Sequence, residues 1–133
     1  MEGVSVMEER VSIMRNDTMY LKGPEGLLVV VDTGATMEGV ISKYKLPRGY
    51  GNQVRKGLPT CVKMGNGQNV WSEGEVDIPI DWNGNTQHCR CLVLDTNAFE
   101  CVVGMRFLDK VSVEGVLLNP PALLLKNGDK VVR

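Results

Sequence analysis

Three Asn-Gly pairs constrain the fold of this chain more than any other feature of its sequence. Each lies between runs rich in β-branched and other apolar residues, and they occur at Asn66-Gly67, Asn83-Gly84 and Asn127-Gly128. Asn-Gly is the strongest short signal for a two-residue hairpin turn, because both positions tolerate positive φ. The sequence therefore predicts three β-hairpins, the first over Val62 to Val76 and the last over Leu123 to Val132.

The remaining segments also favour an all-β fold. A further hairpin is expected from Met19 to Asp32, around the turn Gly23 to Gly26. Helical periodicity is almost absent, and the one helix that we expect is short and begins near Met105. A chain of 133 residues is long enough to bury one core, so we expect a single domain over residues 1–133.

Charge and hydropathy exclude two classes of partner. The chain has 15 Lys and Arg against 16 Asp and Glu, which gives a formal net charge of -1. It therefore has no global field that would attract nucleic acid or anionic lipid. No apolar run is long enough for a signal peptide or a membrane span. We expect a soluble, intracellular protein that binds neither nucleic acid nor a membrane.

The cysteines do not form a recognised metal-binding pattern. Cys89 and Cys91 are two residues apart, which on a strand places both on the same face, and no CxxC pair accompanies them. The other two thiols, Cys61 and Cys101, and the single histidine, His88, add no ligand pair with zinc spacing. We expect reduced thiols, no metal and no cofactor.

The apolar run that ends at Asp32 carries the strongest candidate for chemistry. In VVVDTGAT, Val29 to Thr36, a lone carboxylate is followed by a small hydroxyl residue, a glycine and an alanine. Taken alone, Asp32 is equally an ordinary turn residue after a strand. Phosphate-binding loops also use an Asp-Thr-Gly box, but they belong to chains in which strands and helices alternate, and here the helices are missing.

Three motifs in one order resemble the retropepsin family of aspartic proteases, in particular those of retroviruses and retrotransposons. The apolar run into Asp-Thr-Gly-Ala comes first, the glycine-bearing hairpin second, and ECVVGMRFLDKV, with two valines before Gly104, third. The resemblance covers roughly Met19 to Val111. It implies an all-β, retropepsin-like closed barrel with one short C-terminal helix, active as a homodimer.

The resemblance implies that two aspartates act together. Two carboxyls about 3 Å apart cannot both ionise, so they share one proton; one activates water while the other donates a proton. This chain has one complete Asp-Thr-Gly box and is too short for two lobes, so the second carboxyl would be Asp32 of another copy. A further Asp-Thr pair, which begins at Asp95, lacks the glycine and is interpreted as the end of a strand.

The resemblance also implies a role for each residue of the site. Asp32 would be catalytic, Thr33 would tie the two loops of the dimer together, and Gly34 would let substrate backbone approach without a Cβ in the way. Gly104 would let the chain pass behind this loop. The residues expected to contact substrate are Ala35 and Thr36 beside it, Met64, Gly65, Asn66 and Gly67 at the tip of a closing flap, and Val102 in a side-chain pocket.

One position departs from the family pattern. Many retroviral proteases carry an Asp directly after Asp-Thr-Gly-Ala, which pairs with an Arg on the short helix. Here that position is Thr36, while Arg106 remains. The departure favours retrotransposon-like relatives within the family.

The sequence therefore predicts an aspartic endopeptidase that cleaves extended, mostly apolar peptide segments, within the polyprotein that contains it. Peptide would be held between flap and floor by strand-like main-chain hydrogen bonds, and the expected location is the cytoplasm or a virus-like particle. The alternative is a non-catalytic retropepsin-fold module for dimerisation or peptide binding. The strands expected at the dimer seam are Val4 to Met7 and Lys130 to Val132.

Overall fold

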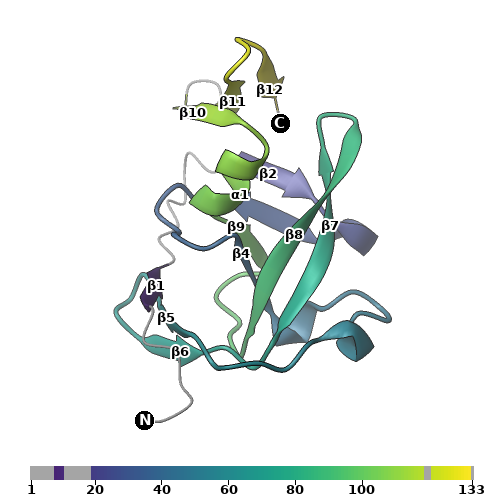
Figure 1. Cartoon of the computed structure of the whole chain (residues 1–133), viewed down its shortest axis with the longest axis vertical. Coiled ribbons are helices and arrows are strands. Elements are labelled where there is room, and N and C mark those ends of the chain that lie inside the picture. Colours follow the sequence, from purple (N-terminus) through teal and green to yellow (C-terminus); the bar gives the residue numbers. More distant parts are fainter. Residues whose placement is uncertain (1–7, 11–18, 119–120, 133) are drawn as a thin grey trace.

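The structure is a computed structural model of the chain, and it describes residues 8–10, 19–118 and 121–132. Within these residues most of the regular structure is β-strand, and one short α-helix follows the strand β9 (Cys101–Val103; Figure 1). The expected all-β class is therefore confirmed. The segment Val4 to Met7, which we expected at a dimer seam, lies outside the described residues.

Six strands close into a barrel. In the order in which they pair around it, they are β2 (Met19–Lys22), β3 (Leu28–Val31), β9 (Cys101–Val103), β4 (Gly39–Ser42), β8 (Asn85–Leu94) and β7 (Glu75–Trp82). The pairs β3–β9 and β4–β8 are parallel, and the other pairs are antiparallel. A single residue pair, Lys22 with Asp81, joins β2 to β7 and completes the closure.

Two smaller sheets and the helix flank the barrel (Figure 1). One sheet has the order β1 (Glu8–Arg10), β5 (Cys61–Lys63) and β6 (Asn69–Trp71); the other has the order β10 (Val113–Leu118), β11 (Pro121–Leu125) and β12 (Lys130–Val132). The helix α1 (Met105–Lys110) begins where the sequence predicts it. Short 3-10 turns occur at η1 (Pro24–Gly26), η2 (Lys43–Lys45) and η3 (Gly51–Gln53).

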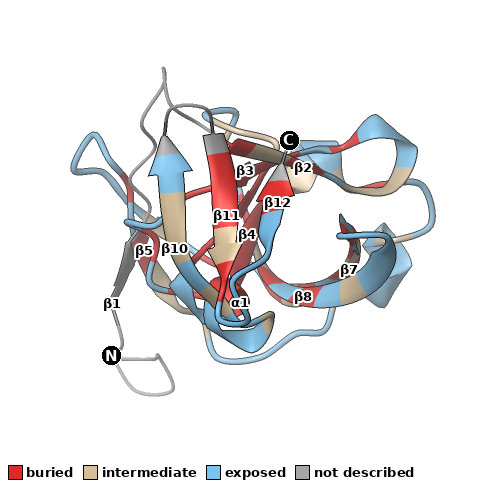
Figure 2. Ribbon diagram, turned by 90° about the horizontal axis from the view of Figure 1, so that it is seen from above, coloured by how far each residue is buried: buried red, intermediate tan, exposed pale blue. Residues whose placement is uncertain are grey.

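The core lies inside the barrel, because the long strands alternate between buried and exposed residues. On β7, Val76, Ile78 and Ile80 are fully buried, whereas the residues between them are not. This alternation is visible as changing colour along β7 and β8 in Figure 2. The helix contributes Phe107, whose ring meets that of Trp82 edge-on at 6.2 Å and 89°. Burying such a ring stabilises the fold by about 1.5–3 kcal/mol, so α1 is anchored to the barrel.

All four expected hairpins are present, but the Asn-Gly turns are of two kinds. The turn between β7 and β8 has two residues, Asn83 and Gly84, with φ of 48° and 82°. The other two Asn-Gly turns are longer, and only their glycines, Gly67 and Gly128, have positive φ, at 86° and 92°. The prediction of a two-residue turn is therefore wrong at these two places.

The side chain of the turn asparagine accounts for the difference. At Asn66 the side-chain oxygen accepts the N–H of Gln68 at 2.9 Å, and at Asn127 it accepts the N–H of Asp129 at 2.9 Å. Such a local bond mimics a backbone turn and holds the asparagine at negative φ, which leaves only the glycine in the left-handed region. At these two places the Asn-Gly motif therefore closes a three-residue turn, which lies between Met64 and Gln68 in one hairpin and between Leu125 and Asp129 in the other.

The Asp-Thr pair that begins at Asp95 follows the end of a strand, as expected. Asp95 directly follows β8, is about half exposed, and accepts a hydrogen bond from the Tyr44 hydroxyl at 2.6 Å. The Lys43 ammonium lies 3.5 Å from the same carboxylate. The Tyr44 bond and then the charge of Lys43 lower the pKa of Asp95. This carboxyl is therefore engaged at the surface.

Three thiols pack together in the barrel. Cys91 Sγ lies 3.8 Å from Cys89 Sγ and 4.0 Å from Cys101 Sγ, and all three residues are fully buried and unbridged. The sulfurs fill space beside Gly39, where a Cβ would lie 2.6 Å from Cys89 Sγ. Over the described residues no group of three or more His, Cys, Asp or Glu side chains is arranged to hold a metal ion, and no helix is long and apolar enough to cross a membrane.

The packing predicts that one thiol in four reacts quickly. Cys61 is partly exposed, whereas hydrogen bonds with Cys101 and Cys89, together with burial, raise the pKa of Cys91 well above its ordinary value. Because the thiolate is the nucleophile, a raised pKa slows alkylation. A short iodoacetamide pulse followed by peptide mass spectrometry should label Cys61 alone, and all four sites after unfolding. Equal labelling of Cys61 and Cys91 in the folded protein would contradict this packing.

Candidate active site

The position of Asp32 is set by the barrel. It follows β3 directly, and its backbone N–H donates to Val103 O at 3.0 Å, which extends the parallel pairing of β3 with β9. Its side chain is almost wholly buried, with 5% of the residue exposed. Asp32 Oδ1 accepts the N–H of Gly34 at 2.9 Å, and Asp32 O accepts the N–H of Ala35 at 3.1 Å. The carboxyl is thus fixed in a tight turn, and one of its oxygens is hydrogen-bonded to that turn.

The residues after Asp32 alternate between the surface and the interior. Thr33, Gly34 and Thr36 are exposed, whereas Ala35 is fully buried. The buried carboxyl therefore lies directly beneath an exposed rim of small residues. The absence of a side chain at Gly34 leaves the backbone of this rim open to another chain.

A second backbone segment crosses behind this loop at Gly104. Its N–H donates to Glu38 O at 2.9 Å, and the N–H of Met105 donates to Ala35 O at 2.8 Å. A Cβ at Gly104 would lie 2.4 Å from Met37 O and 2.7 Å from Ala35 O, closer than real Cβ contacts come. The expectation that Gly104 lets the chain pass behind the loop is confirmed.

Replacing Gly104 by alanine should destabilise the protein, because the new methyl group would push two backbone carbonyls away from it. Overpacking of this kind costs about 1–3 kcal/mol, and urea unfolding would measure it. Gly115→Ala is the matched control, since a Cβ there meets no atom within 4 Å. Equal free energies of unfolding for the two variants would show that the crossing is not tight.

Glu38 holds the far end of the loop, a role that the sequence did not indicate. Its Oε1 accepts the backbone N–H of Arg90 at 2.8 Å and a hydrogen bond from Lys110 Nζ at 3.2 Å. One carboxylate thereby joins the loop to β8 and to α1. Its partners lie 52 and 72 residues away in the chain, so no local pattern could have identified it.

The hairpin formed by β5 and β6 packs against apolar residues of the Asp32 loop and of β9. Val62 is fully buried and Met64 is 7% exposed, and both belong to one apolar cluster with Ala35 and Val102. The structure thus brings together three of the residues expected to contact substrate, Ala35, Met64 and Val102. Val102 and Ala35 are themselves fully buried within this cluster.

The remaining expected contact residues lie apart from this cluster. Gly65, Asn66 and Gly67 form the exposed tip of the hairpin, and Thr36 lies on the exposed rim. Arg106 is exposed on α1 and lines a pocket of about 230 Å³ together with Met37, Glu38, Gly39, Thr60, Glu75, Arg90 and Leu92. On one side the pocket is lined by Met37 to Gly39, which continue the Asp32 loop. On another it is lined by Thr60, the residue directly before β5.

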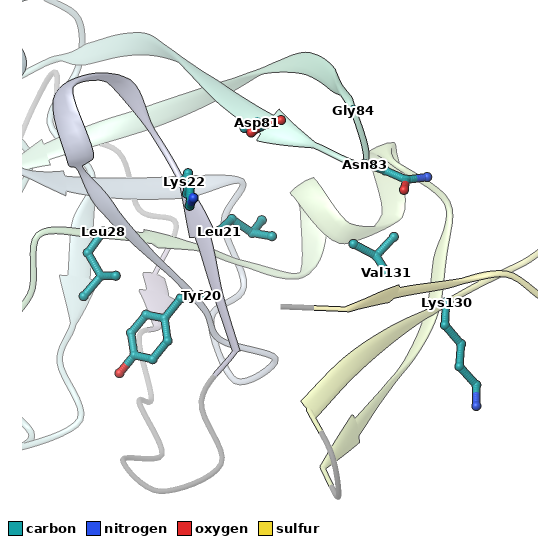
Figure 3. A pocket seen from close by; sticks show the side chains of 9 residues that line it. All are labelled: Tyr20, Leu21, Lys22, Leu28, Asp81, Asn83, Gly84, Lys130 and Val131. Carbon is teal, nitrogen blue, oxygen red and sulfur yellow. The ribbon is translucent and has the colours of Figure 1, made fainter.

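A separate cavity of about 550 Å³ lies elsewhere on the barrel (Figure 3). It is bounded by β2, the turn between β7 and β8, and β12, and it includes Lys22 and Asp81, the pair that closes the barrel. It also includes Leu28, at the start of β3, whereas Asp32 follows the end of that strand. Because no residue of the Asp-Thr-Gly box lines this cavity, it is not part of the candidate active site.

The fold has counterparts among solved structures. Four chains match, and one is EIAV protease in complex with the inhibitor HBY-793, with a TM-score of 0.54 and 21% sequence identity, over 79% of this chain and 96% of that chain. At this identity the likeness establishes the fold alone. No family model and no curated protein matches the sequence. The closed six-stranded barrel with one short helix is thus a retropepsin-like fold, as the sequence predicts.

Proposed function

We propose that this chain is an aspartic endopeptidase that works as a homodimer, in which each copy supplies Asp32 as one of two catalytic carboxyls. The observation that carries the proposal is the setting of Asp32. It is buried at the end of β3, bonded by Gly34, and lies beneath an exposed rim of small residues on a retropepsin-like barrel.

The chemistry follows from bringing two such carboxyls together. Two adjacent carboxyls share one proton, so one is a carboxylate that takes a proton from water while the other donates its proton to the peptide. The bond from the Gly34 N–H to Asp32 Oδ1 fixes the orientation of the carboxyl within its loop. Burial strengthens the interaction between the two groups.

The second carboxyl comes from another copy of the chain. Thr33 and Gly34 are exposed beside Asp32, so the same rim on a second copy can meet them in a self-complementary contact. Asp95, which also begins an Asp-Thr pair, is engaged by Tyr44 and Lys43, which argues against it as the partner. Lys130–Val132 forms β12, paired with β11 on one edge, and remains the proposed seam strand.

The substrate is proposed to be an extended peptide with apolar side chains, within the polyprotein that contains this chain. It would lie between the flap tip, Gly65 to Gly67, and the Asp32 loop, held by main-chain hydrogen bonds. Movement of Met64 would open the apolar cluster to a substrate side chain, and its return would exclude water. The chain would act in the cytoplasm or in a virus-like particle.

Asp32→Asn should abolish cleavage and leave the fold intact, because an amide cannot act as the base that activates water. General base catalysis contributes on the order of 10²–10⁴-fold, so kcat on a peptide library at mildly acidic pH should fall by at least that factor. The matched control is Asp95→Asn, which changes the surface Asp-Thr pair and should leave kcat unchanged. Thermal unfolding of each variant would verify the fold.

Two outcomes would contradict the proposal. Wild-type rates from purified Asp32→Asn would exclude the aspartic mechanism. A wild-type dimer that binds peptide or a statine-type transition-state mimic but cleaves nothing would favour the alternative, a non-catalytic dimerisation or peptide-binding module.

Activity should require two chains. Specific activity is expected to fall on dilution as dimers dissociate, since one Asp32 per chain cannot form the pair. With a threefold excess of Asp32→Asn, random pairing should leave roughly a quarter of the activity per wild-type chain. Enzyme assays alongside analytical ultracentrifugation would measure both effects. A monodisperse monomer that cleaves peptide, or activity insensitive to the inactive variant, would refute the shared site.

A further inference from the structure

The strand β1 occupies an edge of the flap. It pairs in parallel with β5, with Glu8 opposite Cys61, Glu9 opposite Val62 and Arg10 opposite Lys63. The other edge of β5 pairs with β6. Both edges of the first flap strand are therefore filled by segments of the same chain, and Figure 1 shows β1 alongside β5.

The edge that β1 fills is the one best placed to receive a peptide. Of the two flap strands, β5 lies closer to the floor: Val62 is fully buried against the cluster of Ala35 and Val102, whereas on β6 Val70 is only partly buried and Trp71 is exposed. An extended peptide between flap and floor would pair with the strand nearest the floor, and β6 already takes the opposite edge of that strand. A peptide that extends from the flap tip along β5 therefore needs the positions that β1 holds.

The sequence of β1 makes it a weak occupant with a high local concentration. Its three residues, Glu-Glu-Arg, are charged, and Glu has a low preference for strands. A three-residue ladder provides few main-chain hydrogen bonds. Only eight residues, 11–18, separate β1 from the barrel strand β2, and a connection of this length gives an effective concentration on the order of millimolar.

We propose that residues 8–10 are an intramolecular competitor, which holds the peptide-binding edge of the flap and must leave it before a peptide strand can bind. The competitor is weak because of its sequence and effective because of its short connection to β2, so a separate peptide binds the edge only in competition with it. The effect on catalysis rests on the proposed peptidase function, whereas the effect on peptide binding does not.

The test uses full-length chains that carry Asp32→Asn, so that no peptide is cleaved. In one, Glu9→Pro with Arg10→Pro removes both backbone N–H groups; since successive N–H groups on a strand point to opposite sides, the N–H used in the ladder is lost whichever it is. In the matched control, Glu9→Ala with Arg10→Ala removes the charges and keeps both N–H groups. The probe is a fluorescent peptide, SVMEERVSIM, with the sequence of residues 5–14.

The proline chain should bind the probe saturably, by fluorescence anisotropy, with a Kd about tenfold below that of the alanine chain, as expected when the free edge is populated about a tenth of the time with β1 intact. A scrambled peptide should bind to neither chain. Equal Kd values for the two chains, or no binding to either, would overturn the proposal. Urea unfolding of both chains would verify that the barrel is unaffected.

The same substitutions in the wild-type Asp32 background separate this inference from the proposed function. For a peptide substrate, the proline chain should show a lower KM with kcat unchanged, and the alanine chain should match wild type. Catalysis with identical KM in all three chains would refute the competitor and leave the peptidase. Absence of catalysis in all three, with the binding difference retained, would refute the peptidase and leave the competitor.

Discussion

The crossing of two backbone segments at Gly104 is the constraint on which the rest of the site depends. The parallel pairing of β3 with β9 delivers Asp32 and Gly104 to the same end of the barrel, and the missing Cβ lets the segments touch. The bonds from Gly104 to Glu38 O and from Met105 to Ala35 O then hold the loop in place. These contacts are made by backbone atoms, so they depend little on which side chains surround them.

The residues around Asp32 differ in what they do: some bury its carboxyl, and others hold its loop through hydrogen bonds. A carboxyl that is almost wholly removed from water needs a polar partner, and the N–H of Gly34 supplies one. Glu38, further along the loop, joins it to β8 and α1 through a carboxylate with two donors. The loop is thus hydrogen-bonded at both ends, and the hairpin formed by β5 and β6 packs against it through apolar side chains, among them Met64. Movement is therefore expected in the hairpin formed by β5 and β6 rather than in the Asp32 loop.

The sequence predicts the parts of this molecule whose causes are local. The Asn-Gly pairs locate their hairpins because their conformational preference acts over two residues, and α1 begins where expected because Gly104 precedes it. The type of turn at Asn66 was not predictable, since it depends on whether the side chain bonds to the backbone. The pairing of β1 gave no signal at all, because three charged residues do not have the pattern of a strand.

For the site, the sequence identified Asp32 and its loop but not what surrounds them. Val102 was expected to line a side-chain pocket, and its full burial in one cluster with Met64 depends on how the hairpin formed by β5 and β6 packs on the barrel. The two partners of Glu38 come from elements far away in the chain. Contacts of this kind result from the closed barrel as a whole, and single-sequence patterns contain no information about them.

The parallel pairing of β3 with β9 also determines at which stage of synthesis the candidate site can form. Val29 pairs with Cys101, so the strand that carries Asp32 has no neighbour on that side until the chain has been synthesised well past its middle. Pairings between such distant residues are slow to form, because the loop between them must first be closed. During translation, a nascent chain that ends before residue 101 therefore lacks the support for its carboxyl. Assembly of the candidate site is therefore expected late in folding, once Cys101–Val103 can pair with β3.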